Sequence, residues 1–435
     1  MSSIETSLLG ANMTSAAILS VGDELVLGQT VDTNSAWLSA QLASVGVRVA
    51  IHQTVGDDQS SIEQAIRELA RFPLLLVTGG IGPTEDDLTR QALADVLQQP
   101  LELDEGWLRE LHRFWQQRGR VMPQVNRVQA MVPRTATMIH NHAGTAAGIR
   151  ARIGECDVFV MPGVPREMKL MFERDVLPYV RSLAGGAVIL SRTLHTFSQG
   201  ESAIAEMLGD LMRRDRNPSV GTTVSGGVVS LRLNARFDDR LAAEKAIAET
   251  EAACRARLGS LVFGADEQTL QQVVVRQLLD ARATVSTAES CTGGLIAKMI
   301  TDVPGSSGCF HAGFIVYSNA AKCERLGINR EMLGAFGAVS EPVVEALARN
   351  ARRLTRSTYA LSVSGIAGPE GGSPSKPVGT VCLALAFPRA HDPKETDVLV
   401  RTVHLVGDRD LIRDRAAKTA LTLLRYKLLD QPPPF

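Results

Sequence analysis

The strongest chemical signal in the sequence is a serine that follows an apolar strand. The run TAESCTGG, residues 287–294, places Ser290 on a turn between that strand and a helix expected from Gly293. A hydroxyl on such a turn projects from the backbone, and N–H groups at the helix start can stabilise an oxyanion. Cys291 is the rival nucleophile, because a thiol at a helix N-terminus has a lowered pKa. The plainer alternative is that Ser290 or Thr292 only caps the helix.

A serine nucleophile needs a base, and the segment YSNAAK, residues 317–322, offers Lys322. If burial lowers the pKa of this lysine, its neutral amine can accept the serine proton. Alternatively, Lys322 is a solvated charge early in a helix. Neither segment contains a histidine, and His311, at the start of the preceding strand, is expected to be structural. Together the two segments predict acyl transfer.

Two further segments would complete this site. The run SGIAGPEGGSPSKPVGT, residues 364–380, follows an apolar strand and is rich in glycine and proline, which suits a loop that wraps a small ligand. The run GDRD, residues 407–410, opens the last expected helix. Arg409 and Arg413 can pair bidentately with a phosphate, although each is equally compatible with an exposed helical charge.

Glycines and carboxylates also follow strands in the first part of the chain. Asp23 and Glu24 come after the strand expected over 16–21, TGGIGPTEDD (78–87) comes after another apolar strand, and MPGVPREM (161–168) follows a third. Glycines bring backbone N–H groups close to a phosphate, which makes this edge a candidate nucleotide site. The alternatives are turn glycines and acidic caps favoured by the helix dipole.

The glycine run ends in three consecutive carboxylates, Glu85, Asp86 and Asp87. Carboxylates beside an anion cradle make sense if a hard cation such as Mg²⁺ bridges them to phosphate oxygens. We therefore take these three residues as candidate metal ligands.

The elements that must position these residues divide the chain. Strands and helices alternate over residues 15–182, which predicts a doubly wound α/β domain. A small α+β module is expected over 183–264, and a further α/β domain over 265–435. Residues 1–14 are expected to be a flexible leader.

Composition narrows the function further. Hydrophobic residues make up 45% and charged residues 21% of the 435-residue chain, which is typical of a globular protein and excludes extended disorder. The 46 Lys+Arg against 47 Asp+Glu give no overall field that would attract nucleic acid or an anionic membrane. The six cysteines form no C-x-x-C pair, the N-terminus lacks a basic region, and no apolar run could span a membrane. We expect a cytoplasmic protein with small-molecule ligands.

Together AESCTGG, YSNAAK, GAVSEP, SGIAGPEGG, KPVGT and GDRD resemble the C-terminal domain of the CinA family (competence/damage-inducible protein A), which also occurs alone as a nicotinamide-nucleotide amidase. The resemblance implies cofactor-free hydrolysis of nicotinamide mononucleotide (NMN) to nicotinic acid mononucleotide and ammonia. It implies Ser290 as nucleophile, Lys322 as base and Tyr317 as an assisting group. The other candidates for oxyanion or substrate binding are Cys291, Thr292, Gly293, Asn319, Ser364, Gly365, Gly368, Gly379, Thr380, Arg409 and Arg413.

The segments VGDELVLGQTVDTNSAWL, TGGIGPTEDDLTR and MPGVPREM resemble the N-terminal domain of the same family, which has a molybdopterin-cofactor-binding-like fold. The resemblance implies a metal-dependent ADP-ribose pyrophosphatase in members where this domain is active, and both activities would then serve pyridine-nucleotide salvage. A pterin-phosphate site is the alternative for this domain. The nucleotide-binding candidates are Gly22, Asp23, Glu24, Asn34, Thr78, Gly79, Gly80, Gly82, Pro83 and Gly163.

The middle module resembles a KH-type arrangement of strands and helices, but it lacks the G-x-x-G clamp that grips a nucleic-acid backbone. We expect a linker or dimerisation element, and the family resemblance implies a homodimer. A non-enzymatic role in competence or the DNA-damage response remains an alternative to the amidase.

Overall fold

The computed structural model describes residues 15–183 and 188–435, so the expected leader, residues 1–14, lies outside the described residues. The described residues divide into two compact units, 15–183 and 188–190 with 234–247, and 191–233 with 248–435. The predicted α/β class is confirmed. Among the described helices, none is long and apolar enough to cross a membrane.

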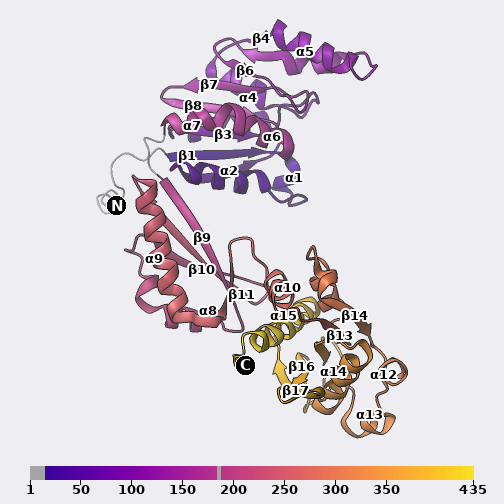
Figure 1. The fold of residues 1–435 in the computed structure, drawn as a ribbon. Helices are drawn as coiled ribbons and strands as arrows, with labels where there is room; N and C mark the ends of the chain where they lie inside the picture. Colours follow the sequence, from indigo (N-terminus) through magenta and orange to yellow (C-terminus); the bar gives the residue numbers. More distant parts are fainter. Residues whose placement is uncertain (1–14, 184–187) are drawn as a thin grey trace. The chain divides into compact units, whose positions relative to one another are not determined.

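The first domain is built on a six-stranded sheet with the order β2-β1-β3-β8-β7-β6 (Figure 1). The first four strands of this order are parallel, and β7 and β6 are antiparallel to their neighbours. Every residue of β3 and β8 is buried, as expected for strands covered on both faces. The strands are β1 (Ser15–Val21), β2 (Arg48–Val55), β3 (Leu74–Thr78), β6 (Thr137–Ile139), β7 (Gly148–Ile153) and β8 (Cys156–Met161), beside a two-stranded ribbon of β4 (Leu101–Leu103) and β5 (Met131–Pro133).

Helices cover both faces of this sheet, which confirms the doubly wound prediction. Along β1, Ala17 and Leu19 face one apolar core with α3 and α4, whereas Ala16 and Ile18 face another with α2 and α6. Alternate residues of a strand point to opposite faces, so one strand serves both cores. The helices are α1 (Asp23–Val26), α2 (Thr33–Ser44), α3 (Gln59–Leu69), α4 (Thr89–Leu97), α5 (Glu105–Gln116), α6 (Pro165–Met171) and α7 (Leu177–Leu183).

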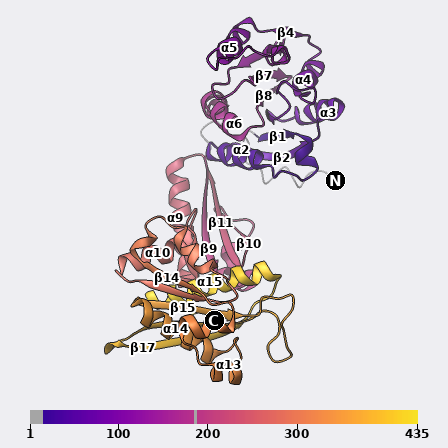
Figure 2. The same cartoon turned by 90° about the vertical axis from the view of Figure 1, so that its right-hand side faces the viewer.

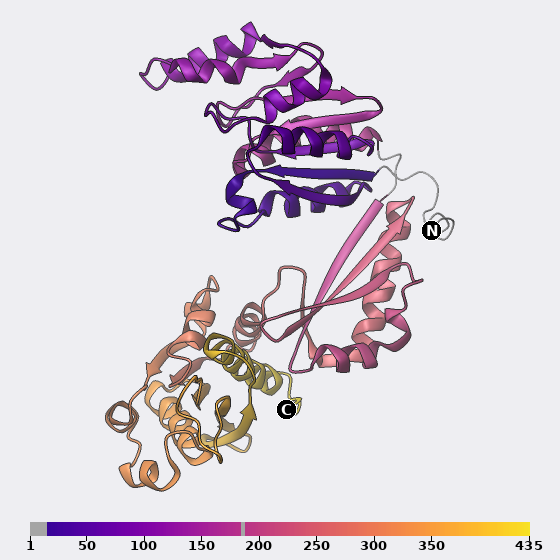
Figure 3. The ribbon, with the colours of Figure 1, turned by 180° about the vertical axis from the view of Figure 1, so that it is seen from behind.

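The middle of the chain forms a four-stranded sheet with the order β10-β11-β9-β12. Helices α8 and α9 lie on one side of it (Figure 3), and their residues Ile204 and Cys254 share an apolar core with Leu231 of β11. The elements are β9 (Val188–Phe197), α8 (Glu201–Leu208), β10 (Ser219–Ser225), β11 (Val228–Phe237), α9 (Arg240–Leu258) and β12 (Val262–Ala265).

The C-terminal domain has a five-stranded sheet with the order β14-β13-β15-β16-β17. The first three strands are parallel and the last two run antiparallel. Helices α10 and α15 pack on one face and α14 packs on the other (Figure 2), and α11 shares the apolar core of α10 and α15. The elements are α10 (Leu270–Asp280), β13 (Val285–Glu289), α11 (Leu295–Thr301), β14 (Phe310–Ile315), α12 (Asn319–Leu326), α13 (Arg330–Phe336), α14 (Glu341–Thr355), β15 (Tyr359–Gly365), β16 (Thr380–Arg389), β17 (Asp392–His404) and α15 (Arg409–Leu428).

Candidate functional site

Ser290 and Lys322 meet at one edge of the C-terminal sheet. Strand β13 ends at Glu289 and its parallel neighbour β14 ends at Ile315, directly opposite in the register. The carboxyl ends of parallel strands lie at the same edge, so the segments that follow them are brought together. Ser290 is the first residue beyond β13, Lys322 lies in the first turn of α12, and the lysine Nζ is 3.2 Å from the serine Oγ.

The lysine side chain is almost completely buried. Lys322 is 1% exposed and Ser290 is 8% exposed. Besides the serine hydroxyl, the amine contacts the carbonyl oxygens of Val316 at 2.9 Å and Tyr317 at 3.3 Å. Burial lowers the pKa of Lys322 below its usual value, because the ammonium form loses hydration. The alternative of a solvated surface lysine is therefore wrong for the described structure.

The helix start behind Ser290 is occupied by a carboxylate that we did not predict. Glu289 is fully buried, and its two oxygens accept hydrogen bonds of 2.8–3.0 Å from backbone N–H groups at the start of α11, namely those of Gly294, Ile296 and Ala297. A further N–H, that of Gly293, donates to the carbonyl of Ser290 at 3.1 Å. These four N–H groups are therefore not available to stabilise an oxyanion. The prediction of Gly293 as an oxyanion donor does not hold in this arrangement.

The N–H groups of Cys291 and Thr292 remain. Both lower the pKa of the Cys291 thiol. Burial acts more strongly in the opposite direction and raises the pKa of Cys291 to about 12. This thiol is protonated at neutral pH, so the structure disfavours Cys291 as the rival nucleophile.

The two predicted arginines of α15 reach different parts of this site. Arg409 donates to the Gly368 carbonyl at 2.7 Å and to the Tyr317 hydroxyl at 3.1 Å. Tyr317 is 61% exposed at the rim. Arg413 donates to two backbone carbonyls of the turn that follows Ser290.

The predicted ligand loop is held by its own polar groups. The Ser364 hydroxyl donates to the Ala338 carbonyl at 2.8 Å, and the Thr380 hydroxyl donates to the Pro377 carbonyl at 2.7 Å. Gly379 has φ +95°, and a Cβ there would lie 2.0 Å from the Leu405 carbonyl oxygen, so only glycine fits. Gly365 is the last residue of β15, and a Cβ there would lie 3.1 Å from the sulfur of Cys291. Asn319 instead lines a separate cavity of about 340 Å³ with Cys323, Arg330 and Leu333.

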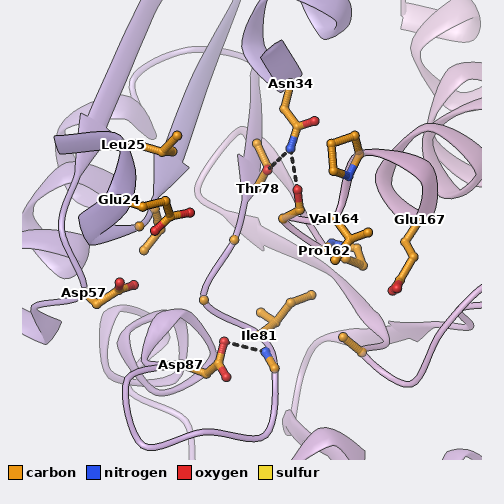
Figure 4. Close-up of a pocket in the computed structure, with 18 of the residues that line it drawn as sticks. Glu24, Leu25, Asn34, Asp57, Thr78, Ile81, Asp87, Pro162, Val164 and Glu167 are labelled. Atoms are coloured by element: carbon orange, nitrogen blue, oxygen red, sulfur yellow. Dashed lines mark hydrogen bonds between the residues drawn. The ribbon is translucent and has the colours of Figure 1, made fainter. Parts of the chain in front are cut away.

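A second candidate site is a cavity of about 590 Å³ at the carboxyl ends of β1, β3 and β8 (Figure 4). Gly79 has φ +103°, and a Cβ there would lie 2.2 Å from the Val21 carbonyl oxygen, so this turn requires glycine. Two predicted residues, Asp23 and Glu85, are not in the lining. The predicted residues that line the cavity are Gly22, Glu24, Asn34, Thr78, Gly79, Gly80, Gly82, Pro83, Asp86, Asp87 and Gly163.

Asn34 joins the segments around this cavity. Its amide nitrogen donates to the Thr78 hydroxyl at 3.1 Å and to the Gly163 carbonyl at 2.8 Å (Figure 4). Helix α2 is thereby tied to the ends of β3 and β8. The buried amide oxygen of Asn34 has no hydrogen-bond partner among the described residues.

The three consecutive carboxylates do not form a metal site as we had expected. Asp87 accepts from the Gly82 N–H at 2.7 Å and the Thr84 N–H at 2.9 Å, so its two oxygens brace the loop. Glu85 is exposed outside the cavity lining, whereas Asp86 and Asp87 both line it. Within residues 15–183 and 188–435, no group of three or more His, Cys, Asp or Glu side chains is arranged to hold a metal ion.

Asp57 is a cavity residue that the sequence analysis missed. Burial raises the pKa of Asp57, and the nearby charges of Asp23, Glu24 and Asp86 raise it further. Figure 4 shows Glu24 and Asp57 on one side of the cavity and Glu167 on the other. Asp57 follows β2 in the run VGDD, so the strand-end pattern that pointed to Asp23 could have found it.

Comparison with protein families covers nearly the whole chain. The CinA C-terminal domain matches residues 267–428, and the KH domain of damage-inducible protein CinA matches residues 191–264. A molybdopterin binding domain matches residues 17–182.

Two relatives match almost the whole chain, and a solved structure matches about a third of it. A competence-damage inducible protein of Symbiobacterium thermophilum is 44% identical over 420 residues, which cover 95% of this chain and 99% of the relative. A CinA-like protein of Geobacter metallireducens is 41% identical over 415 residues, with 95% and 99% covered. The crystal structure of a competence/damage inducible protein from Agrobacterium tumefaciens is 38% identical, covers 37% of this chain and 97% of that one, and has a TM-score of 0.34. The chain therefore belongs to the CinA family.

Proposed function

We propose that the C-terminal domain is a nicotinamide-nucleotide amidase that converts NMN and water to nicotinic acid mononucleotide and ammonia. The observation that carries the proposal is the buried pair in which Lys322 Nζ lies 3.2 Å from Ser290 Oγ. The choice of NMN as substrate depends on the family resemblance of the surrounding motifs. Its positively charged pyridinium ring makes the attached carboxamide more electrophilic than an ordinary aromatic amide.

The hydrogen bonds of Lys322 suit a general base. A neutral amine has two N–H groups and one lone pair. The carbonyls of Val316 and Tyr317 take the two N–H groups, which leaves the lone pair for the hydroxyl of Ser290. As Ser290 Oγ bonds to the carboxamide carbon, its proton moves to the amine. The proton then passes to the leaving nitrogen, ammonia departs, and water hydrolyses the acyl-enzyme by the same steps.

The lowered pKa of Lys322 predicts how the rate depends on pH. The amine accepts a proton only when neutral, so kcat/KM is expected to rise with pH to a plateau, with its midpoint below the ordinary lysine value of about 10.4. The midpoint is measured from pH–rate profiles at limiting NMN, which report kcat/KM, and at saturating NMN, which report kcat. A rate that falls as pH rises through this range would contradict the assignment of Lys322 as base.

We also infer a pyrophosphatase activity on ADP-ribose for the N-terminal domain. The cavity of about 590 Å³ combines a glycine turn, whose N–H groups suit a diphosphate, with carboxylates that repel one another. When bound, a divalent cation would neutralise phosphate charge there, and Glu24, Asp57 and Asp86 are the carboxylates with suitable oxygen ligands. Because these carboxylates are not arranged as a complete metal site, they would bind the metal jointly with oxygens of the substrate.

The test is hydrolysis of ADP-ribose with and without Mg²⁺. Phosphomonoester products are expected only with the metal, and Asp57→Asn is expected to lower the rate at least tenfold, as is common when one carboxylate of a metal site is lost. Ser290→Ala is the matched control and is expected to hydrolyse ADP-ribose at the wild-type rate. Tight pterin binding without any hydrolysis would favour the molybdopterin alternative instead.

A further inference from the structure

The side chain of Arg413 is directed at the backbone of the nucleophile turn. Its Nε donates to the Cys291 carbonyl at 3.1 Å, and a terminal nitrogen donates to the Thr292 carbonyl at 3.0 Å. The remaining terminal nitrogen is 3.7 Å from Asp410, whose side chain is 93% exposed. A surface ion pair of this kind contributes little, so the two carbonyl contacts account for the placement of the guanidinium.

These contacts determine where one N–H group points. The carbonyl of Cys291 and the N–H of Thr292 belong to the same planar trans peptide, in which the two groups point in opposite directions. A guanidinium that holds the carbonyl on one side therefore directs the Thr292 N–H to the other. This N–H is one of the two in the turn that are left after Glu289 and the carbonyls of Ser290 and Thr292 have accepted from the others.

The second N–H is fixed without an arginine. The Ser290 carbonyl accepts from the Gly293 N–H at 3.1 Å, and the same peptide carries the N–H of Cys291. The hydrogen bond from Gly293 to the Ser290 carbonyl thus orients the Cys291 N–H, in the same way that Arg413 orients the Thr292 N–H. Among the described residues, neither N–H group donates to a backbone carbonyl, which leaves both for a developing oxyanion.

We propose that Arg413 is a positioning residue that holds the Thr292 N–H as an oxyanion donor for Ser290, and that it is not a clamp for the substrate phosphate. The inference rests on the proposed amidase. Lysine cannot replace this arginine, because the fork of Nε and a terminal nitrogen spans two carbonyls and an ammonium is a single point donor. Gly293 has φ +61°, which favours glycine, and a Cβ there would make only an ordinary contact of 3.4 Å with the Arg413 guanidinium.

The first test separates the two roles of Arg413 by steady-state kinetics on NMN. Loss of one oxyanion donor typically lowers kcat by about 100-fold or more, and mispositioning is expected to lower it by at least about tenfold in both Arg413→Gln and Arg413→Lys. KM is expected to change little. A rise in KM with an unchanged kcat, rescued by Arg413→Lys, would show a phosphate clamp and overturn the proposal.

The second test does not depend on NMN. A fluorophosphonate probe forms a bond from Ser290 Oγ to phosphorus and releases fluoride, while its phosphoryl oxygen occupies the oxyanion position. Labelling of Ser290, measured by mass spectrometry, is expected to be at least about tenfold slower in Arg413→Gln than in the wild-type protein. Asp410→Asn, which removes only the exposed partner, is the matched control and should label at the wild-type rate.

The outcomes of the labelling test are distinct. If wild-type Ser290 is labelled but NMN is not hydrolysed, the substrate assignment fails and the positioning role is still decided by the labelling rates. Equal labelling of the wild-type protein and Arg413→Gln overturns the positioning role while the amidase stands. If wild-type Ser290 is not labelled, Ser290 is not an activated nucleophile and both proposals fall. Melting curves of each variant exclude unfolding as the cause of a slower rate.

Discussion

Ser290→Ala is expected to lower ammonia release from NMN by about three orders of magnitude or more, because the variant lacks the atom that attacks the carboxamide. The change removes one hydroxyl from a side chain that is 8% exposed, and the fold is expected to persist. Purified wild-type and variant proteins are compared for ammonia release without added metal, and their melting curves are compared in parallel.

The control for this experiment is Cys291→Ala at the neighbouring position. The pKa of Cys291 is raised to about 12 by burial, so its thiol is not a nucleophile at neutral pH and the variant is expected to keep activity. Retention of activity in Ser290→Ala together with its loss in Cys291→Ala would reverse the two roles. Loss in both variants with intact folds would mean that the turn tolerates no change, and labelling of Ser290 would then decide.

The pairing of Ser290 with Lys322 could be predicted because it follows from topology. Each residue comes shortly after an apolar strand, and parallel neighbours such as β13 and β14 end at the same edge. Burial of Lys322 could not be read from the sequence, because α12 is short and polar and the lysine is covered by other segments of the chain.

The sequence could not predict which backbone N–H groups are already hydrogen-bonded to side chains and which are left for a ligand. Glu289 caps α11 from the strand that precedes it, and a carboxylate in the run AES gives no sign of which N–H groups it will reach. The same holds for Asp87, which looked like a metal ligand but braces its own loop at Gly82. Short-range spacing shows which residue types are present, whereas the direction of each side chain depends on the folded turn.

The buried parallel strands were the most predictable elements of the fold. Strand β3 starts with four apolar residues and β1 is mostly apolar, as expected for strands of a sheet covered on both faces. Two edge strands, β6 and β17, were not predicted. Strand β17 contains charged residues from Asp392 onward, and β6 has three residues, so neither carries a hydrophobic period long enough to recognise.

Lys322→Met is expected to lower kcat for NMN by about two to four orders of magnitude, because positioned general bases contribute that much. The rise of the rate with pH should disappear, since the group that loses its proton is gone. Methionine has a similar length and no charge, so the buried space stays filled. Ammonia release across the pH range measures both effects.

Stability should change in a characteristic way in the same variant. The pKa of Lys322 is lower in the folded than in the unfolded protein, where it is about 10.4. Below the folded-state pKa, the wild-type fold buries an unfavourable ammonium. Its stability therefore rises as the pH increases between the folded-state and the unfolded-state pKa. Methionine leaves the Val316 and Tyr317 carbonyls without this donor at every pH. The Tm of the variant relative to wild type should therefore be highest at low pH and decline as pH rises through this window.

Lys298→Met is the matched control for both measurements. Lys298 lies in α11, and its exposed amine pairs with Asp302. Its replacement is expected to leave the rate, the pH profile and the pH dependence of the Tm difference unchanged, because an exposed ion pair contributes little. If Lys322→Met kept more than about a tenth of the wild-type rate with the same pH profile, the base would have to be another group, because loss of a general base lowers the rate at least about 100-fold. If both lysine variants lost activity equally, the effect would come from the surrounding turn and the buried amine would have no special role.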